Sequence, residues 1–275
     1  MEPDPKAITH YWHARHIPGL SLMRADLRSY GYARHTHDGY VIAVTESGGS
    51  QVFSRGVAEA MDANVLFVSN PAEVQASWMN GTSRWQHRSF YLDATGVAEV
   101  ARTFGFREVP RFMRSFNGDP ELIKRLLALH RMFEEASDAF GEREAFVETF
   151  AELFRRHGSG RKPIEPGPRD RTLLHRAIRL MQERYAEPLP LDDVAAALGL
   201  SPFQLIGLFK RGIGLTPHAY LTQVRLDAAR KRLRGGQPIA SAAVACGFYD
   251  QSALTRYFRR CYAMTPKQFI ASSRL

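Results

Sequence analysis

The sequence is poor in cysteine and has no segment of the kind that crosses a membrane. Its 275 residues contain two cysteines, Cys246 and Cys261, and no C-x-x-C pair. Both fall in helical patterns, so we expect two buried thiols in a reducing compartment, not a disulfide or a zinc knuckle. No apolar stretch approaches the roughly 20 residues that span a bilayer, and the first residues, MEPDPKAITHYW, lack the basic and apolar regions of a signal peptide. We therefore expect a cytoplasmic protein without a membrane partner.

Acidic residues are scarce in one part of the chain only. Residues 1–160 hold 18 Lys and Arg against 20 Asp and Glu, whereas residues 161–275 hold 19 against 8, a net charge of +11. A basic excess confined to one part of a chain is typical of nucleic-acid binding, because Lys and Arg neutralise phosphates. A basic surface that only improves solubility is the alternative that charge by itself leaves open.

Turn-forming residues divide the chain near the same point. The segment HGSGRKPIEPGPRDR gathers three Pro and three Gly without apolar periodicity, which predicts a linker at 158–171. It separates a first domain, 1–157, from a second domain, 172–275. We expect an α+β protein in which the first domain is a β-barrel or sandwich with flanking helices and the second is all-α.

The first domain alternates short strands with turns. Between residues 20 and 92, four segments are rich in β-branched or aromatic residues and are bounded by turn formers: YVIAVTESGG, SQVFSR, NVLFVSNPAEV and RWQHRSFYL. From 120 to 157 the apolar period becomes that of helices, with one stripe from Leu122 to Phe133 and another from Phe146 to Phe154. These helices could cap the barrel or pair two subunits.

The second domain contains one unit twice. LFKRGIGLTPHAY (208–220) aligns with YFRRCYAMTPKQF (257–269), and two copies indicate a duplicated supersecondary unit. Each unit has the pattern helix, glycine-containing turn, helix, with the turn at Gly199 or Gly247 and with Ser201 or Asp250 as the N-cap of the second helix. In the first helix of the second unit, the apolar residues expected to face the core are Ile239, Ala243 and Val244. This is the helix-turn-helix pattern, in which the second helix enters the major groove of DNA. A long helix, expected at 217–234, joins the two units.

Helical spacing defines the face that each second helix turns outward. Leu205, Leu208 and Phe209 form the buried stripe of the first unit, and Leu254, Phe258 and Cys261 form that of the second. The predicted DNA-binding residues lie opposite them: Phe203, Ile206, Gly207 and Lys210 in the first unit, and Gln251, Ser252, Thr255, Arg256 and Arg259 in the second. Hydrogen-bond donors suited to base edges gather in the second unit, which we expect to supply most of the sequence discrimination.

The segment from about Asp170 to Leu275, which carries both units, resembles the DNA-binding domain of the AraC/XylS family of bacterial transcription regulators. LGLSPFQLIGLFKRGIGLTPHAYLTQVRLDAAR and PIASAAVACGFYDQSALTRYFRRCYAMTPKQF carry the resemblance. It implies base contacts from the two second helices, a homodimer, RNA polymerase as a partner, and activation more often than repression. Gly207 departs from the family pattern, in which arginine is common, and glycine costs about 1 kcal/mol of helix propensity relative to alanine.

Residues 20–95 resemble the cupin-like ligand-binding domain found N-terminal in many of these regulators. Metal-binding cupins use a His-x-His pair, a Glu four or five residues later and a distant His. The segment RHTHDGY supplies the pair, His35 and His37, but Val41 and Ile42 follow it and Gln75 stands where the distant His would fall. We therefore expect no bound metal, no other cofactor and no catalytic residue.

A barrel without a metal still encloses a cavity that can hold a small ligand. Strand alternation places Trp85, His87, Ser89 and Tyr91 on one face of the last strand, and the resemblance makes His87 the best inward candidate. The predicted ligand-binding residues are His35, His37, Tyr40, Glu46, Ser77, Trp78, Trp85, His87 and Ser89. Their mixture of polar and aromatic groups suggests a small polar metabolite.

Together these features predict a ligand-responsive, sequence-specific transcription regulator that binds double-stranded DNA and is not an enzyme. The effector-binding and dimerisation domain would occupy 1–157, and its ligand would change the population of domain arrangements that bind DNA. Two other functions stay open. One is a cupin metalloenzyme fused to a DNA-binding tail, which a stoichiometric metal would support; the other is a DNA-binding regulator that needs no effector.

Overall fold

A computed structural model of the chain describes residues 8–29, 31–79, 81–104, 110–135, 138–159, 168–262 and 264–272. It divides into two units, Met1–Ile164 and Glu165–Leu275, whose boundary falls inside the linker expected at 158–171. Helix α4 (Pro168–Arg184) begins within that linker. The three prolines of the segment favoured a linker over its whole length. Pro168, however, is the first residue of α4, a position where the fixed φ of proline suits a helix and its missing N–H costs no hydrogen bond. Linker residues 160–167 lie outside the described residues.

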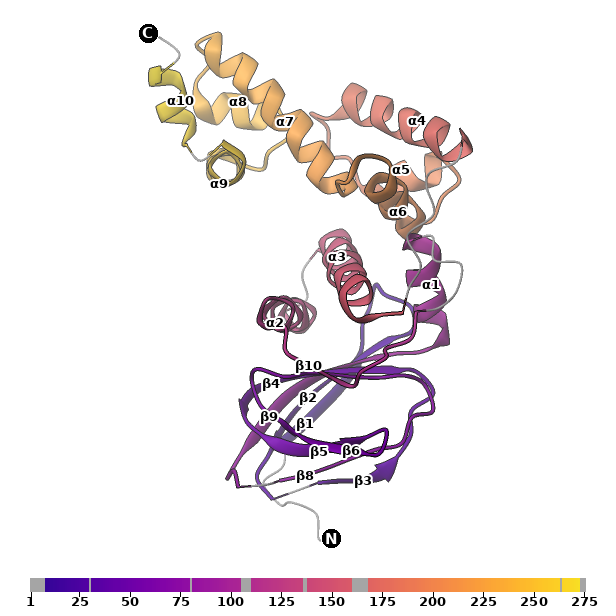
Figure 1. Cartoon of the computed structure of the whole chain (residues 1–275). Coiled ribbons are helices and arrows are strands. Elements are labelled where there is room, and N and C mark those ends of the chain that lie inside the picture. Colours follow the sequence, from indigo (N-terminus) through magenta and orange to yellow (C-terminus); the bar gives the residue numbers. More distant parts are fainter. Residues whose placement is uncertain are drawn as a thin grey trace. The chain divides into compact units, whose positions relative to one another are not determined.

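The first unit consists of two antiparallel sheets that face each other, with helices on one side (Figure 1). The six-stranded sheet, in spatial order, contains β1 (Ile8–His13), β2 (Leu20–Leu27), β9 (Trp85–Leu92), β4 (Tyr40–Gly48), β7 (Leu66–Ser69) and β10 (Phe116–Asn117). The four-stranded sheet, in spatial order, contains β3 (Tyr32–His35), β8 (Gln75–Trp78), β5 (Ser50–Ser54) and β6 (Val57–Met61).

The four strand segments expected from the sequence correspond to β4, β5, β7 and β9. Strand β1 precedes the residues for which strands were expected, and helix α1 (Ala94–Phe104) was not expected either. Strands β3, β6 and β8 are only four or five residues long, too short for alternation to be distinctive. The organisation into a strand-rich first unit and an all-helical second unit is confirmed.

Helices α2 (Pro120–Glu134) and α3 (Ala139–His157) lie over the outer face of the six-stranded sheet (Figure 1). Each begins at an aspartate N-cap: Asp119 accepts the backbone N–H of Leu122, and Asp138 that of Gly141. The expected apolar stripes are buried, and α2 contacts β4 and β9. The helices thus cap the sheet, as one of the two expectations had it.

A buried arginine fixes α2 on the sheet. Arg88, on the outer face of β9, is 4% exposed and forms ion pairs with Glu46 of β4 at 2.8 Å and with Glu134 of α2 at 2.7 Å. Its Nη1 also donates to His130 Nδ1 at 2.9 Å, and His130 Nε2 donates to the carbonyl of Met23 at 3.1 Å. Burial lowers the pKa of His130 to about 4, so the imidazole is neutral and can accept this hydrogen bond.

The second unit is a bundle of seven described helices. They are α4, α5 (Leu191–Ala197), α6 (Pro202–Ile213), α7 (Pro217–Arg234), α8 (Ile239–Ala245), α9 (Gln251–Tyr262) and α10 (Pro266–Ser272). The 18 residues of α7 give a rod of about 27 Å, which carries one helix pair near each end (Figure 1). A core of apolar side chains from α7, α8, α9 and α10 holds the second pair together.

Two expectations about burial in the second unit are wrong. Cys246 is buried, but Cys261 is exposed, because it lies in the last turn of α9 beyond the contact that Phe258 makes with the core. Val244, expected in the buried face of α8, is 64% exposed, and the smaller Ala242 and Ala243 fill that face instead. Among the residues that the structure describes, no single helix is long and apolar enough to cross a membrane; only the bent pair α5 and α6 passes by combined length and composition.

We expect Arg88→Met to lower the free energy of unfolding by about 2–3 kcal/mol at neutral pH, because Glu46 and Glu134 lose a buried counter-charge. Although burial raises the pKa of both carboxyls, hydrogen bonds from arginines lower it more, to below the ordinary 4.5. The contribution of these two carboxylates to the free energy of unfolding is therefore present above about pH 4.5, and it is lost as the pH falls through their lowered pKa values.

Urea denaturation across this pH range is the measurement, with Arg125→Met as the matched control. Arg125 pairs with Glu121 on the exposed side of α2, where both side chains are at least half exposed, so this change should cost less than about 0.5 kcal/mol. Equal losses in the two variants, or a pH-independent loss in Arg88→Met, would contradict the role of Arg88.

Candidate functional site

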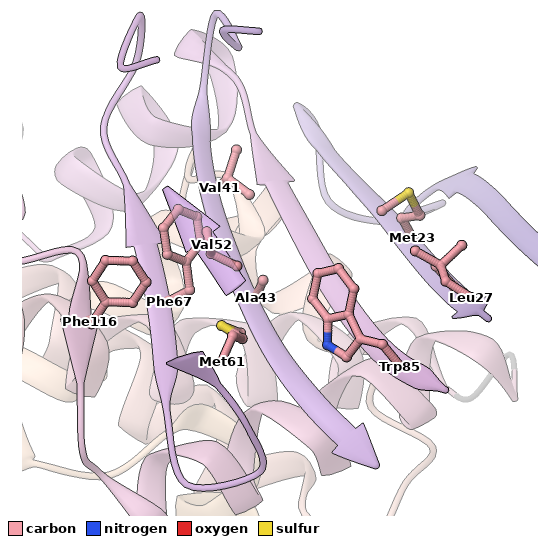
Figure 2. Close-up of a cluster of buried hydrophobic side chains, with 10 residues drawn as sticks. Met23, Leu27, Val41, Ala43, Val52, Met61, Phe67, Trp85 and Phe116 are labelled. Carbon is pink, nitrogen blue, oxygen red and sulfur yellow. The ribbon is translucent and has the colours of Figure 1, made fainter. Parts of the chain in front are cut away.

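The space between the two sheets of the first unit is a cavity of about 580 Å³. That volume lies within the roughly 300–1,000 Å³ of small-molecule sites in proteins. Its apolar wall comes from the inner faces of neighbouring strands: Figure 2 shows Val41 and Ala43 on β4, with Phe67 and Trp85 on the strands to either side. Because side chains alternate along a strand, the same strands turn Tyr40, Ile42 and Phe90 towards the helices.

His87 is a deeply buried polar side chain of the cavity wall. It is 3% exposed and stacks on Trp85, with ring centroids 4.0 Å apart. Burial and the nearby His130 lower the pKa of His87 to about 3, so the ring is neutral at physiological pH. Its Nδ1 has no hydrogen-bond partner among the described residues, and a neutral imidazole nitrogen in that position can donate to or accept from a ligand.

Ser77 faces the cavity from the opposite sheet. It is 6% exposed, and its hydroxyl likewise lacks a hydrogen-bond partner among the described residues. Buried polar atoms in native proteins are nearly always satisfied, so two such atoms in one cavity indicate a ligand or ordered water. The Tyr32 backbone pairs with Ser77 and the Tyr32 ring lies 6.0 Å from that of His87, which places both orphan atoms at the same part of the cavity.

The His35 and His37 pair borders the cavity with its two Nε2 atoms 3.0 Å apart. His35 Nδ1 lies 2.7 Å from the carbonyl of Ala33 and must donate to it, so in a neutral ring His35 Nε2 is an acceptor. The hydrogen between the rings then comes from His37 Nε2. Burial and the neighbouring His35 lower the pKa of His37, which favours this neutral pair.

The cavity does not offer a complete metal site. Where the structure describes the chain, no three His, Cys, Asp or Glu side chains lie close enough to hold one ion. His35 and His37 bond to each other, and Gln75, which borders the cavity where a further histidine would complete a cupin centre, supplies only a weakly coordinating amide. These residues do not fit a bound catalytic metal.

Most of the predicted ligand-binding residues border the cavity: His35, His37, Tyr40, Ser77, Trp85, His87 and Ser89. The Tyr40 hydroxyl, however, donates to the carbonyl of Pro110 at 2.6 Å and is not available to a ligand. Glu46 and Trp78 do not border it. Alternation along β4 places Glu46 on the outer side with Ile42, where it pairs with Arg88 and Arg131, and alternation along β8 turns Trp78 outward beside the inward Ser77.

Several cavity residues were not among those predicted. Tyr91 is half-buried; loss of hydration raises its pKa to about 12, and its hydroxyl donates to the Met23 sulfur at 3.7 Å. The alternation of β9 had placed Tyr91 on the inner face, which is the signal that identifies it. Tyr32 and Met23 lie on β3 and β2, which pair with the distant strands β8 and β9, so no local pattern could have indicated them. Met61 lies on β6, which forms a hairpin with β5.

The second unit carries a polar helix face. Helix α9 starts at Asp250, whose carboxylate accepts the backbone N–H of Ala253 at 2.6 Å. The side chains on its open face are exposed or half-buried: Gln251, Ser252, Thr255, Arg256 and Arg259. Tyr249, directly before the N-cap, is 94% exposed and joins this face, although the sequence pattern had not indicated it.

The corresponding helix of the first pair differs. The axes of α5 and α6 are bent by 87° at a turn in which Gly199 has a φ of +66°, and Ser201 forms a capping box with Gln204. The turn and caps are thus those of a helix-turn-helix unit. The predicted contact residues Phe203, Ile206 and Gly207 are buried here and Lys210 is half-buried, and the first three carry no side-chain donor.

Each of the two units is similar in sequence to a known protein family. Residues 17–154, half of the chain, match the family described as AraC-like ligand binding domain, and residues 194–272 match a helix-turn-helix domain family. An uncharacterized HTH-type transcriptional regulator, YbfI of Bacillus subtilis, is 26% identical over 222 residues, which cover 80% of each chain.

Two further similarities cover about a third of this chain. The HTH-type transcriptional activator RhaS of Klebsiella pneumoniae is 33% identical over 95 residues, 34% of each chain. A crystal structure of a transcriptional regulator from Chromobacterium violaceum, titled as a protein containing an AraC-type DNA-binding domain, is 33% identical. The match covers 38% of this chain and 93% of that one, with a TM-score of 0.36.

The orphan hydroxyl of Ser77 generates a stability prediction. Ser77→Ala should leave the free energy of unfolding unchanged or raise it slightly, because it removes a buried group without a partner. Ser54→Ala is the matched control: Ser54 is also a buried strand serine, but its hydroxyl bonds that of Ser115 at 3.2 Å, and its loss should cost about 1 kcal/mol. If thermal unfolding showed equal losses in both variants, Ser77 would have a partner within the protein.

Proposed function

The chain belongs to the AraC family of transcription regulators, and from that premise we propose that a small molecule bound between its two sheets makes it activate transcription. The family assignment already makes the protein a ligand-responsive, DNA-binding regulator. The observation that carries the rest is the 580 Å³ cavity with two unsatisfied polar atoms. Support for activation comes from the similarity to a relative that is itself named a transcriptional activator.

DNA recognition is proposed to depend mainly on α9. Its exposed Gln251 and Arg256 can each form paired hydrogen bonds with adenine or guanine edges in the major groove. Arg259 and Tyr249 lie at positions suited to phosphate contacts. Helix α6 would contribute binding more than discrimination, since Lys210 is the one predicted contact on it with a polar side chain.

The proposed coupling begins at the cavity wall. Met23 borders the cavity, and its carbonyl accepts the hydrogen bond from His130 of α2. Arg88 lies on the opposite face of β9 from His87, and it donates hydrogen bonds to His130 and Glu134 of α2. A ligand that shifts β2 or β9 would therefore act on α2 directly. The ligand would favour one of two pre-existing states by its difference in affinity for them.

We propose that the chain forms a homodimer through α2 and α3. The inner faces of these helices pack on the sheet, so their outer faces are the ones that could contact a second subunit. RNA polymerase is the proposed protein partner of an activator. No enzymatic role is proposed, because the residues that border the cavity do not form a metal centre and the relatives described above are named as regulators.

For DNA recognition, Arg256→Ala should weaken binding to a selected operator by about 1–3 kcal/mol while changing binding to random DNA much less. The operator is obtained by selection from a random library, and affinity is measured by fluorescence anisotropy over a range of salt. Arg179→Ala on α4 is the control, since Arg179 is 74% exposed in the same unit but on another helix. Equal losses of Arg256→Ala on both DNAs would refute a base contact.

For activation, a reporter carrying that operator should be expressed more strongly when the full chain is present, in cells grown on some carbon sources and not on others. Ala43→Phe fills the cavity from β4 and should abolish that dependence without weakening operator binding measured in vitro. Lower reporter expression with the protein than without it would make the protein a repressor. A response that Ala43→Phe leaves intact would remove the cavity from the mechanism.

A further inference from the structure

The residues that border the cavity include no lysine, arginine or glutamate among those that the structure describes. The two aspartates, Asp38 and Asp93, are exposed at its mouth, and Asp93 accepts the backbone N–H groups of Thr95 and Gly96 at the start of α1. A bound ligand would therefore meet no buried ion pair partner. This is unusual for a site that recognises a carboxylate or a phosphate, since such groups are paired when they are buried.

The basic side chains that border the cavity are histidines: His13, His35, His37 and His87. Burial lowers the pKa of His37 and that of His87. His87 is enclosed by the rings of Trp85 and Tyr32 and lies near the buried His130. His35 and His37 use their Nε2 atoms on each other, and His35 Nδ1 is held by the Ala33 carbonyl.

Ser77 and His87 each have a neutral polar atom without a hydrogen-bond partner among the described residues, and the two side chains lie on opposite walls. Ser77 Oγ comes from the four-stranded sheet and His87 Nδ1 from the six-stranded sheet. A single hydroxyl or carbonyl group between them would satisfy both, because a hydroxyl donates and accepts at the same time. The wall also has a large apolar part, with Met23, Val41, Phe67 and Trp85 among the side chains that a ligand would contact (Figure 2).

We infer that the effector is an uncharged molecule with an aromatic or branched aliphatic body and a hydroxyl or carbonyl group, which bonds Ser77 and His87. This inference rests on the proposed function, in which the cavity is the effector site. Beside Ser77 and His87, a carboxylate would lose its hydration without gaining a cation, and an ammonium group would do so without gaining an anion, because Asp38 and Asp93 are exposed. The ligand class therefore excludes acids and amines and is less polar than the metabolite expected from the sequence.

The test uses the full chain at pH 7.5 and probes that share a body and differ in the head group. Suitable sets are naphthylmethanol, naphthoate and naphthylmethylammonium, together with the cuminyl alcohol, acid and amine. Ligand-observed NMR at millimolar concentration detects binding, and calorimetry gives the affinities. We expect each alcohol to bind at least about tenfold more tightly than its matched acid or amine.

Ser77→Ala should weaken the alcohols by about threefold to tenfold and leave methylnaphthalene, which lacks the polar group, unchanged. Ser54→Ala, whose hydroxyl bonds Ser115 and does not face the cavity, should change none of the affinities. A loss for methylnaphthalene equal to that for the alcohol would mean that Ser77→Ala alters the cavity as a whole, and would contradict the assigned hydrogen bond.

The remaining outcomes separate this inference from the proposed function. An acid or amine that binds as tightly as its alcohol would overturn the inference of an uncharged effector while leaving the cavity as the effector site. If none of the probes, methylnaphthalene included, binds at millimolar concentration, the cavity does not take small molecules, and both the inference and the proposed function fail.

Discussion

The alternation of β9 is the constraint on which the rest of the first unit depends. This strand pairs with both β2 and β4, so it lies in the interior of the six-stranded sheet. Its odd positions, from Trp85 to Tyr91, line the cavity, and its even positions, Arg88 and Phe90, pack under α2 and α3. A shift of the register by one residue would place Arg88 in the cavity and His87 under the helices.

The two faces of β9 are held by different kinds of interaction. On the outer face, Arg88 pairs with two carboxylates and bonds a neutral imidazole, and these contacts connect the strand to α2. On the inner face, His87 keeps a nitrogen without a partner. A strand that is fixed on one side and unsatisfied on the other can respond to a ligand, since binding adds hydrogen bonds on the inner face while the contacts to α2 transmit any displacement.

The sequence was most informative where structure is set locally. The turns at Gly199 and Gly247 have positive φ angles, and Ser201 and Asp250 cap the following helices, as the duplicated pattern predicted. The cavity depends on pairing between distant strands, and there the sequence was less informative. Glu46 was assigned to the cavity because the sequence does not indicate which face of β4 turns inward, and Tyr32 was missed because β3 pairs with the distant strand β8.

Residue size and helix position account for the errors in the second unit. Val244 has the larger apolar side chain, yet alanines occupy the contact face of α8, where α7 and α9 leave room for little more. Cys261 continues the apolar spacing of α9, but the core ends one turn earlier, at Phe258. Periodicity specifies which side chains share a face of a helix, and only the packed neighbours determine how far along the helix that face is covered.

The central claim is that occupancy of the cavity and binding of DNA are coupled, and coupling of this kind is reciprocal. The most direct measurement is therefore the affinity of the full chain for a cavity-bound probe, determined with and without a saturating amount of operator DNA. The account predicts that operator DNA changes the affinity for the probe by the same factor by which the probe changes the affinity for the operator. A probe affinity that operator DNA leaves unaltered would contradict it.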